Sequence, residues 1–236
     1  SCEHEYYFLR HEIQMILAPV SHRVRLEDSS KQSLRYSAKL QRLGKVAFDY
    51  ALTIPALILL APIMLFIALL IKLESPGPVF HRRRVIGRMG REFNMYQFRT
   101  RYVDANDRML RNRQQWVAIL RGKQVANDPR VTRIGYFLRR SGLDHLPRLF
   151  NIMARHMSLV GPYILTRKDA MRIDRQRIEA ITSVLPGLTG IWQVGANSSA
   201  KERTNLELEY VSNWSLRMDF RILFNTFIAV REELPS

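Results

Sequence analysis

An apolar segment at residues 50–71 limits what this chain can fold into more than any other part of its sequence. The segment holds no charged side chain, and Asp49 and Lys72 bound it. About 20 apolar residues are enough for a helix to cross the bilayer core, whereas helices in soluble cores seldom run so long without a polar face. The segment therefore predicts a membrane-inserted helix, with a buried core helix as the alternative.

Two prolines interrupt this segment, and basic residues flank it on both sides. Pro62 lies near its middle, where the missing amide hydrogen predicts a break in the helix. The basic flanks are Lys39, Arg42 and Lys45 before the segment, and Lys72, Arg82, Arg83, Arg84, Arg88 and Arg91 after it. Because basic flanks favour the cytoplasmic side of a membrane, a re-entrant helix that bends at Pro62 is favoured over a straight span.

The composition narrows the classes of partner. The 236 residues carry a formal net charge of +16, which calls for an acidic partner such as nucleic acid, anionic membrane lipid or a phosphorylated substrate. No recognisable nucleic-acid motif accompanies this charge, so a membrane-tethered nucleic-acid binder is disfavoured. The single cysteine, Cys2, excludes a disulfide framework and a cysteine-based zinc site.

The remaining sequence predicts a mostly α-helical fold with few short strands. A turn at residues 75–78 precedes short extended pieces over residues 79–100, divided by Gly87 and Gly90. Helical spacing recurs over residues 104–121, 132–155, 166–184 and 201–231, the last with a break near Trp214. We therefore expect an N-terminal arm (1–42), a re-entrant membrane helix (43–74) and an interfacial, cytoplasmic helical domain (75–236).

Short motifs follow one another in a fixed order over about residues 43–225. They are Lys45, Phe48-Asp49, Pro62, Lys72-Leu73, residues 75–80, Gly87, Gly90, Phe93, residues 98–100, 128–130 and 132–133, Gly135, and residues 138–140, 143–144, 157–162, 186–190, 192–193, 210–211 and 214–215. In this order they resemble the bacterial sugar transferases, the monotopic polyprenyl-phosphate phosphoglycosyl transferases. A resemblance of this length is far more specific than any single motif.

The resemblance implies an enzyme that transfers a phosphosugar from a UDP-sugar to polyprenyl (undecaprenyl) phosphate and releases UMP. This step starts the synthesis of an exopolysaccharide or glycoconjugate. The resemblance also implies a requirement for Mg²⁺ and a location at the cytoplasmic face of the bacterial inner membrane, and it is compatible with a homo-oligomer.

Asp144 stands at the position of the catalytic aspartate that this family uses. The resemblance implies that Asp144 attacks the phosphorus, carries the phosphosugar covalently and helps to bind the metal. We expect four arginines at or beside family motifs to bind phosphate, because a guanidinium can place two donors on phosphate oxygens. These are Arg99, Arg133, Arg139 and Arg140.

The chain departs from the family's pattern at several polar positions. His145 stands in the catalytic pair where the family has glutamate; a histidine can act as a base, but neutral imidazole is a poor ligand for Mg²⁺. Gln97 stands where the family usually has lysine, Tyr163 where it has arginine, and Asn197 where it again has arginine.

Two functional interpretations follow from these departures. The chain is either an active transferase or a catalytically weakened relative that serves as a membrane scaffold or partner subunit. In the first case, another side chain could supply the missing carboxylate, and the candidates are Glu202, Glu207 and Glu209.

Overall fold

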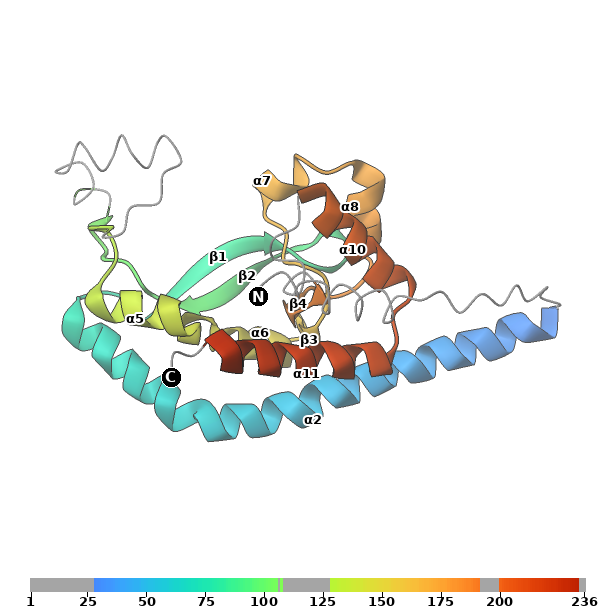
Figure 1. Ribbon diagram of the computed structural model, residues 1–236, viewed down its shortest axis with the longest axis horizontal. Helices are drawn as coiled ribbons and strands as arrows, with labels where there is room; N and C mark the ends of the chain where they lie inside the picture. Colours follow the sequence, from blue (N-terminus) through green and yellow to red (C-terminus); the bar gives the residue numbers. More distant parts are fainter. Residues whose placement is uncertain (1–27, 106, 108–127, 192–199, 234–236) are drawn as a thin grey trace. The chain divides into compact units, whose positions relative to one another are not determined.

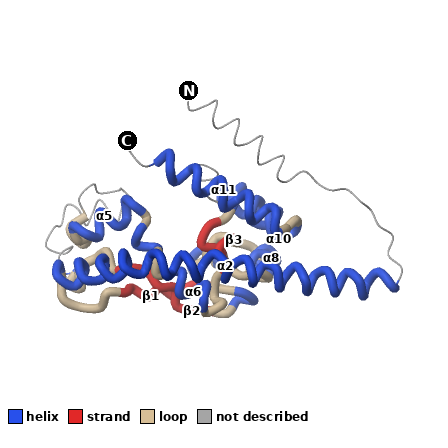
Figure 2. The backbone as a smooth tube through the Cα atoms, turned by 90° about the horizontal axis from the view of Figure 1, so that it is seen from below, coloured by secondary structure: helices blue, strands red, loops and turns tan. Residues whose placement is uncertain are grey.

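The computed structural model describes residues 28–105, 107, 128–191 and 200–233 and is mostly helical (Figures 1 and 2). Its helices are α2 (Asp28–Glu74), α5 (Arg133–Ser141), α6 (Arg148–Met153), α7 (Arg167–Ala170), α8 (Arg175–Ile181), α10 (Ala200–Ser212) and α11 (Leu216–Glu233), with short 3-10 helices η1 (Arg88–Gly90) and η2 (Leu143–His145). Its strands are β1 (Phe80–Ile86), β2 (Glu92–Phe98), β3 (Ser158–Val160) and β4 (Gly187–Thr189). The predicted mostly α-helical class with few short strands is confirmed.

The apolar segment lies within α2, which continues through Pro55 and Pro62. Residues Gln41–Glu74 are long and apolar enough to cross a membrane. Their most apolar 18-residue stretch has a mean hydropathy of 2.9, and only 17% of that stretch is buried. A core helix of a soluble protein would be mostly buried instead. The exposed apolar surface therefore favours the membrane-inserted helix, while the re-entrant path stays a prediction.

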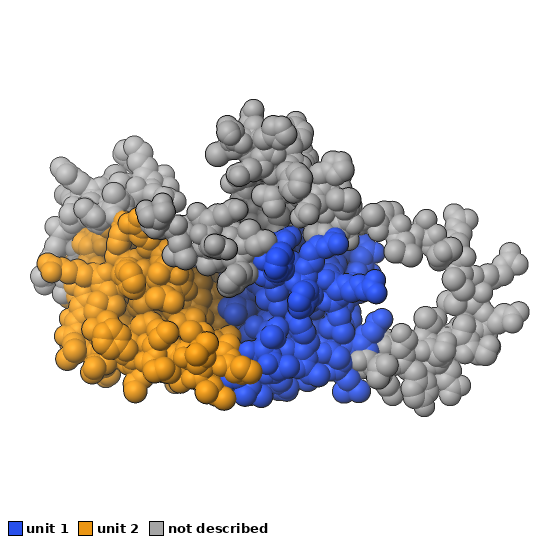
Figure 3. Space-filling view, turned by 60° about the horizontal axis from the view of Figure 1, so that its bottom comes forward, with its two compact units in different colours: residues 1–54, 85–93, 152–236 blue, residues 55–84, 94–151 orange. Residues whose placement is uncertain are grey.

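The described chain divides into two compact units (Figure 3). Unit 1 comprises residues 1–54, 85–93 and 152–236, and unit 2 comprises residues 55–84 and 94–151. In unit 1, β3 and β4 pair in parallel, with Ser158 opposite Gly187 and Val160 opposite Thr189. Helix α11 contacts both strands, and α10 packs against α8.

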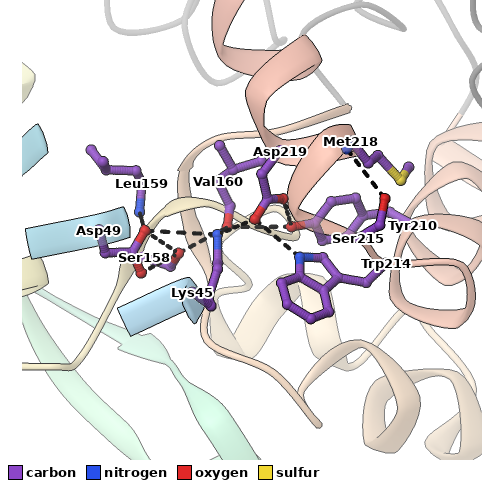
Figure 4. A network of polar contacts seen from close by, with 10 residues as sticks. All are labelled: Lys45, Asp49, Ser158, Leu159, Val160, Tyr210, Trp214, Ser215, Met218 and Asp219. Atoms are coloured by element: carbon purple, nitrogen blue, oxygen red, sulfur yellow. Dashed lines mark hydrogen bonds and ion pairs between the residues drawn. The ribbon is translucent and has the colours of Figure 1, made fainter. Parts of the chain in front are cut away.

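A buried polar network holds unit 1 together (Figure 4). The Lys45 ammonium of α2 donates to Asp219 Oδ2 at 2.6 Å and to the Val160 carbonyl at 2.9 Å. Asp219 also accepts from the Tyr210 hydroxyl (2.7 Å) and from Trp214 Nε1 (3.0 Å). The network thus joins α2, β3, α10 and α11, which lie far apart in the sequence.

The core of unit 2 forms on one face of α2. Met64, Ile67 and Ile71 pack with Phe98 of β2 and Leu138 of α5, and all five are nearly inaccessible to solvent. The three α2 residues follow the spacing of a single helical face. The apolar helix therefore serves as the packing surface for the elements that position the site described below.

Of the helices predicted after β2, some are confirmed and one is wrong. The helical pattern over residues 132–155 is confirmed as α5, η2 and α6, and the break near Trp214 is confirmed between α10 and α11. The single helix predicted over residues 166–184 is wrong, because α7 and α8 are separate. The Thr166–Asp169 capping box starts α7, and Asp174 starts α8 in extended conformation. Most of the helix predicted at 104–121 lies outside the described residues, as do Trp192 and Asn197.

Gly135 allows α5 to approach the backbone of unit 2 closely. A Cβ atom at this position would overlap the Thr100 carbonyl oxygen. We expect Gly135→Ala to destabilise the fold by about 1–3 kcal/mol, because a packed backbone has to shift. Thermal unfolding followed by circular dichroism checks this, with Ser141→Ala on the exposed end of α5 as the control. Equal melting temperatures for the two variants would contradict the close approach.

Candidate active site

Asp144 lies in unit 2, in the short helix η2 that follows α5. Thr132 caps the start of helix α5, where its side chain accepts a hydrogen bond from the Gly135 amide, and Gly142 caps the end in a left-handed conformation (φ 69). Glycine adopts this conformation without steric cost, which makes it a common helix terminator. The turn at Gly142 brings η2 back against α5, and this fixes the position of Asp144.

The Asp144 carboxylate is largely removed from solvent and lies in a cationic field. The residue is 9% exposed. Burial raises the pKa of the Asp144 carboxyl, while the positive charges of Arg148 and Arg139 act in the opposite direction. A weakly hydrated carboxylate beside two guanidinium groups suits an attack on an electrophile whose oxygens are anionic.

His145 links Asp144 to strand β2. Its Nδ1 lies 3.3 Å from Asp144 Oδ2 and 3.1 Å from Gln97 Nε2. Burial lowers the pKa of His145 to about 4, and the Arg148 charge adds to this effect. The imidazole is therefore neutral at physiological pH. Gln97 and His145, two positions where the resemblance predicts other residues, thus contact each other directly.

Arg99 closes the C-terminal end of α2. Its Nη2 donates to the Ser75 carbonyl oxygen at 2.7 Å and to Ser75 Oγ at 2.8 Å, and its Nη1 donates to the Pro76 carbonyl oxygen at 2.7 Å. Carbonyl groups at a helix end lack partners within the helix and need such donors. The structure therefore uses Arg99 to hold the turn after the apolar helix, and its binding of phosphate stays a prediction.

The other predicted arginines are exposed on α5, and they differ in their relation to Asp144. Arg139 Nε donates to Thr100 Oγ1 at 2.9 Å, which fixes the guanidinium whose charge acts on Asp144. Among the described residues of α5, Arg133 and Arg140 show no such effect on the pKa of Asp144. Their role as phosphate ligands stays a prediction.

Sequence reasoning missed Arg148, the first residue of α6. Its charge is the largest influence that lowers the pKa of Asp144, and it also lowers the pKa of His145. The spacing of four residues between Asp144 and Arg148 was the available signal, since oppositely charged residues at that spacing often lie on one side of a helical turn.

The residues around Asp144 offer few oxygen ligands for Mg²⁺. Within the described part of the chain, no three histidine, cysteine, aspartate or glutamate side chains lie close enough to hold a metal ion. Asp144 is accompanied by an imidazole, whereas Mg²⁺ prefers oxygen ligands. These residues do not fit a Mg²⁺ site built by protein groups alone. A metal role for Asp144 requires oxygen atoms from a bound phosphate compound and stays a prediction.

The alternative carboxylates belong to a different unit from Asp144. Glu202, Glu207 and Glu209 lie on α10 in unit 1. Glu207 is buried at 2% exposure, and burial raises the pKa of Glu209. Their participation at Asp144 therefore stays a prediction.

The sequences of curated relatives align with most of this chain. The exopolysaccharide production protein PSS of Rhizobium leguminosarum bv. phaseoli is 37% identical over 199 residues, which cover 78% of this chain and 94% of the relative. ExoY of Rhizobium meliloti, also named an exopolysaccharide production protein, is 35% identical over 80% of this chain and 85% of its own length. The Escherichia coli K12 UDP-glucose:undecaprenyl-phosphate glucose-1-phosphate transferase is 34% identical over 79% of this chain, but over only 40% of its own length.

A family model described as "Bacterial sugar transferase" matches residues 40–233. The match runs from the α2 segment before the apolar run, through the η2 turn that carries Asp144, to the last turn of α11. Since the match covers most of the chain, and relatives above 30% identity align over nearly their whole length, the chain belongs to the bacterial sugar transferase family.

Proposed function

We propose that this protein transfers a sugar phosphate from a UDP-sugar to polyprenyl phosphate, with Asp144 as the nucleophile. The observation that carries the proposal is the buried Asp144 carboxylate, on which the positive charges of Arg139 and Arg148 act, in a member of the sugar transferase family. Relatives named for undecaprenyl-phosphate sugar-phosphate transfer and for exopolysaccharide production support the choice of substrates and pathway class.

The proposed reaction has two displacements at one phosphorus atom. An Asp144 oxygen attacks the phosphorus that bears the sugar, and the bond from this phosphorus to the oxygen of the UMP group breaks. UMP leaves, and the phosphosugar is held on Asp144 as an acyl phosphate. A phosphate oxygen of the polyprenyl phosphate then attacks the same phosphorus. The Asp144–phosphorus bond breaks, and the carboxylate is regenerated with a lipid-linked diphosphosugar as the product.

The neighbours of Asp144 suit these two displacements. Arg139 and Arg148 supply positive charge where phosphate oxygens gather negative charge, and charges fixed in advance need no reorganisation during the reaction. Thr100 Oγ1 holds Arg139 through its Nε. His145, neutral and in contact with Gln97 through Nδ1, places an uncharged ring beside the Asp144 carboxylate.

The membrane placement is part of the proposal, because the acceptor is a lipid and the donor is water-soluble. Helix α2 provides the membrane-inserted segment. On α11, Phe220 and Phe224 are exposed, and they alternate with Arg217 and Arg221. Exposed aromatic rings alternating with basic residues are typical of helices that lie at a membrane interface. We propose that the domain sits on the cytoplasmic face of the inner membrane.

The assay for the function is release of UMP. Purified protein in nanodiscs is supplied with polyprenyl phosphate and a panel of UDP-sugars, and UMP is measured together with the lipid-linked product. Release of UMP that depends on the lipid acceptor supports the proposal. Absence of UMP across a broad panel of sugars would reject it.

A re-entrant α2 predicts that both of its basic flanks lie on the same side of the membrane. In a Cys2→Ser background, single cysteines are placed at Gln41 and Lys72 on the two basic flanks. Because both flanks remain on the cytoplasmic face, an impermeant maleimide should label both in inside-out vesicles and neither in spheroplasts. A Met171→Cys variant on the exposed surface of unit 1 serves as the control for cytoplasmic labelling. Labelling of the residue 72 position from the periplasm would establish a straight span instead.

His145 favours a second candidate function, a membrane scaffold with little catalytic activity. The feature behind this candidate is the imidazole in place of a second carboxylate beside Asp144. The two candidates differ in UMP release: a wild type that forms product excludes the scaffold, whereas product formation only by His145→Glu favours it.

We expect His145→Glu to create a Mg²⁺ site beside Asp144, because two adjacent carboxylates offer the oxygen ligands that this cation prefers. Titration calorimetry with Mg²⁺ alone should show about tenfold tighter binding than for the wild type. His145→Gln, which adds no charge, should match the wild type. Equal affinities for all three proteins would show that position 145 does not govern metal binding.

A further inference from the structure

Unit 1 contains a cavity of about 370 Å³ beside the part of α2 that precedes the apolar segment. Its walls come from α2, η1, the segment around β3, the turn before β4 and the end of α10. The lining residues are Gln41, Arg42, Lys45, Val46, Asp49, Arg88, Arg155, Ser158, Val160, Ser183, Val184, Leu185, Tyr210, Val211 and Trp214. None of these residues takes part in the chemistry proposed at Asp144.

The floor and the rim of this cavity differ in charge. On the floor, the Lys45 ammonium is neutralised by Asp219 at 2.6 Å and by Asp49 at 3.7 Å (Figure 4). The rim carries three exposed guanidinium groups, from Arg42, Arg88 and Arg155, and among the lining residues the only carboxylate is the buried Asp49. The accessible part of the cavity is therefore strongly cationic, which favours an anionic ligand.

Two of the rim arginines are held in place by the fold. The Arg155 guanidinium lies over the Tyr50 ring, 6.0 Å from its centre, and the Tyr50 hydroxyl donates to the Met153 carbonyl. Arg155 adopts a left-handed backbone conformation (φ 60), which non-glycine residues take up only where the surroundings enforce it. Arg88 Nε donates to the Ser183 carbonyl oxygen at 3.3 Å. Fixed guanidinium groups lose less conformational entropy when they bind a ligand.

Insertion of the apolar segment along the bilayer normal would place the cavity at the level of lipid headgroups. Lys45 precedes the first residue of the apolar segment by about 7 Å along the helix, given a rise of about 1.5 Å per residue. The headgroup layer outside the hydrocarbon core is about 5–8 Å thick on each side. When the apolar segment is inserted, the rim arginines therefore lie at the depth of lipid phosphate groups, where juxtamembrane basic residues meet anionic lipids.

We propose that the cavity rimmed by Arg42, Arg88 and Arg155 is a binding site for the phosphate group of an anionic membrane lipid, separate from the site at Asp144. The ligand is recognised by its phosphate oxygens and net negative charge, which match three guanidinium groups. The site anchors unit 1 beside the entry point of α2 and takes no part in phosphosugar transfer.

Native mass spectrometry of the full chain, released from nanodiscs, tests the proposal by counting retained lipids. The probes are phosphatidylglycerol and, as a neutral headgroup, phosphatidylcholine. The variant Arg42→Gln/Arg88→Gln/Arg155→Gln removes the rim charges. The control variant Lys168→Gln/Arg172→Gln/Arg175→Gln removes the same amount of charge from exposed positions of unit 1. Melting temperatures of both variants confirm that they fold.

We expect wild type and control to retain phosphatidylglycerol in preference to phosphatidylcholine. The rim variant should retain at least about tenfold less phosphatidylglycerol than the wild type. Adding millimolar inorganic phosphate tests whether the site recognises the phosphate group alone or the lipid as a whole. Displacement of the lipid by phosphate shows that the phosphate group alone is recognised, and resistance shows that the lipid as a whole is recognised. Equal retention by both triple variants, or equal retention of both lipids by the wild type, would overturn the proposal. Because no group of this cavity reacts, failure of the UMP assay leaves the result unaffected.

Discussion

Replacing Asp144 with asparagine is expected to lower sugar-phosphate transfer by about 10⁴-fold or more, because the change removes the carboxylate that carries the phosphosugar in the proposed mechanism. Asparagine has nearly the same shape as aspartate, so the cationic surroundings from Arg139 and Arg148 remain in place. Formation of UMP in a single turnover, measured by rapid quench, isolates the first displacement. A radiolabelled sugar should also stay bound to the wild type after acid quench, and not to the variant.

Stability provides the control for the Asp144 variant. Burial raises the pKa of Asp144 above its value in the unfolded chain, so at neutral pH the ionised carboxylate is less favourable in the folded state. This cost shrinks as the pH falls toward the raised pKa, and asparagine removes it. The melting temperature of Asp144→Asn should therefore equal or exceed that of the wild type. Asp174→Asn, at an exposed position in unit 1, should keep full activity. Substantial turnover by Asp144→Asn would show that a different group is the nucleophile.

The elements that the sequence predicts well are those with a long periodic signal. Residues 50–71 are apolar throughout, and α2 contains them all. The break between α10 and α11 was expected near Trp214, and it falls there. By contrast, β3 and β4 have three residues each and pair across a long stretch of chain, through Ser158–Gly187 and Val160–Thr189. Strands this short carry too little alternation to be recognised from sequence.

The candidate site shows a similar division. Asp144 could be named because it lies in a motif, and the position of Arg139 on α5 agrees with a role beside it. The contact between Gln97 and His145 could not be predicted from the sequence, because it joins β2 to η2 through tertiary packing. Arg99 is the opposite case, in which a motif suggested one role and the structure shows another contact. Its motif position suggested a phosphate ligand, but its Nη1 and Nη2 donate to carbonyl groups at the end of α2, which only the three-dimensional arrangement reveals.

Asp219→Ala is expected to have the largest effect on stability, about 3–5 kcal/mol, because it leaves the Lys45 ammonium and two further donors without their buried partner. Asp219 is 0% exposed, so water cannot take its place without disturbing the packing. A loss of this size corresponds to a fall in melting temperature of roughly 10 °C for a protein of this length. Thermal unfolding in detergent, followed by circular dichroism, measures it.

A double-mutant cycle separates the ion pair from general damage to packing. Lys45→Met removes the ammonium but keeps most of the length of the side chain, and it leaves Asp219 as a buried charge with fewer partners. If the pair is the source of the stabilisation, the double variant Lys45→Met/Asp219→Ala should lose clearly less than the sum of the single losses, since neither charge is then left alone. Ser212→Ala, on the exposed side of α10, should change the melting temperature little and serves as the control. Strictly additive losses would show that Lys45 and Asp219 stabilise unit 1 independently. In that case the link from α2 to α11 would be a consequence of the packing of unit 1 and would not hold it together.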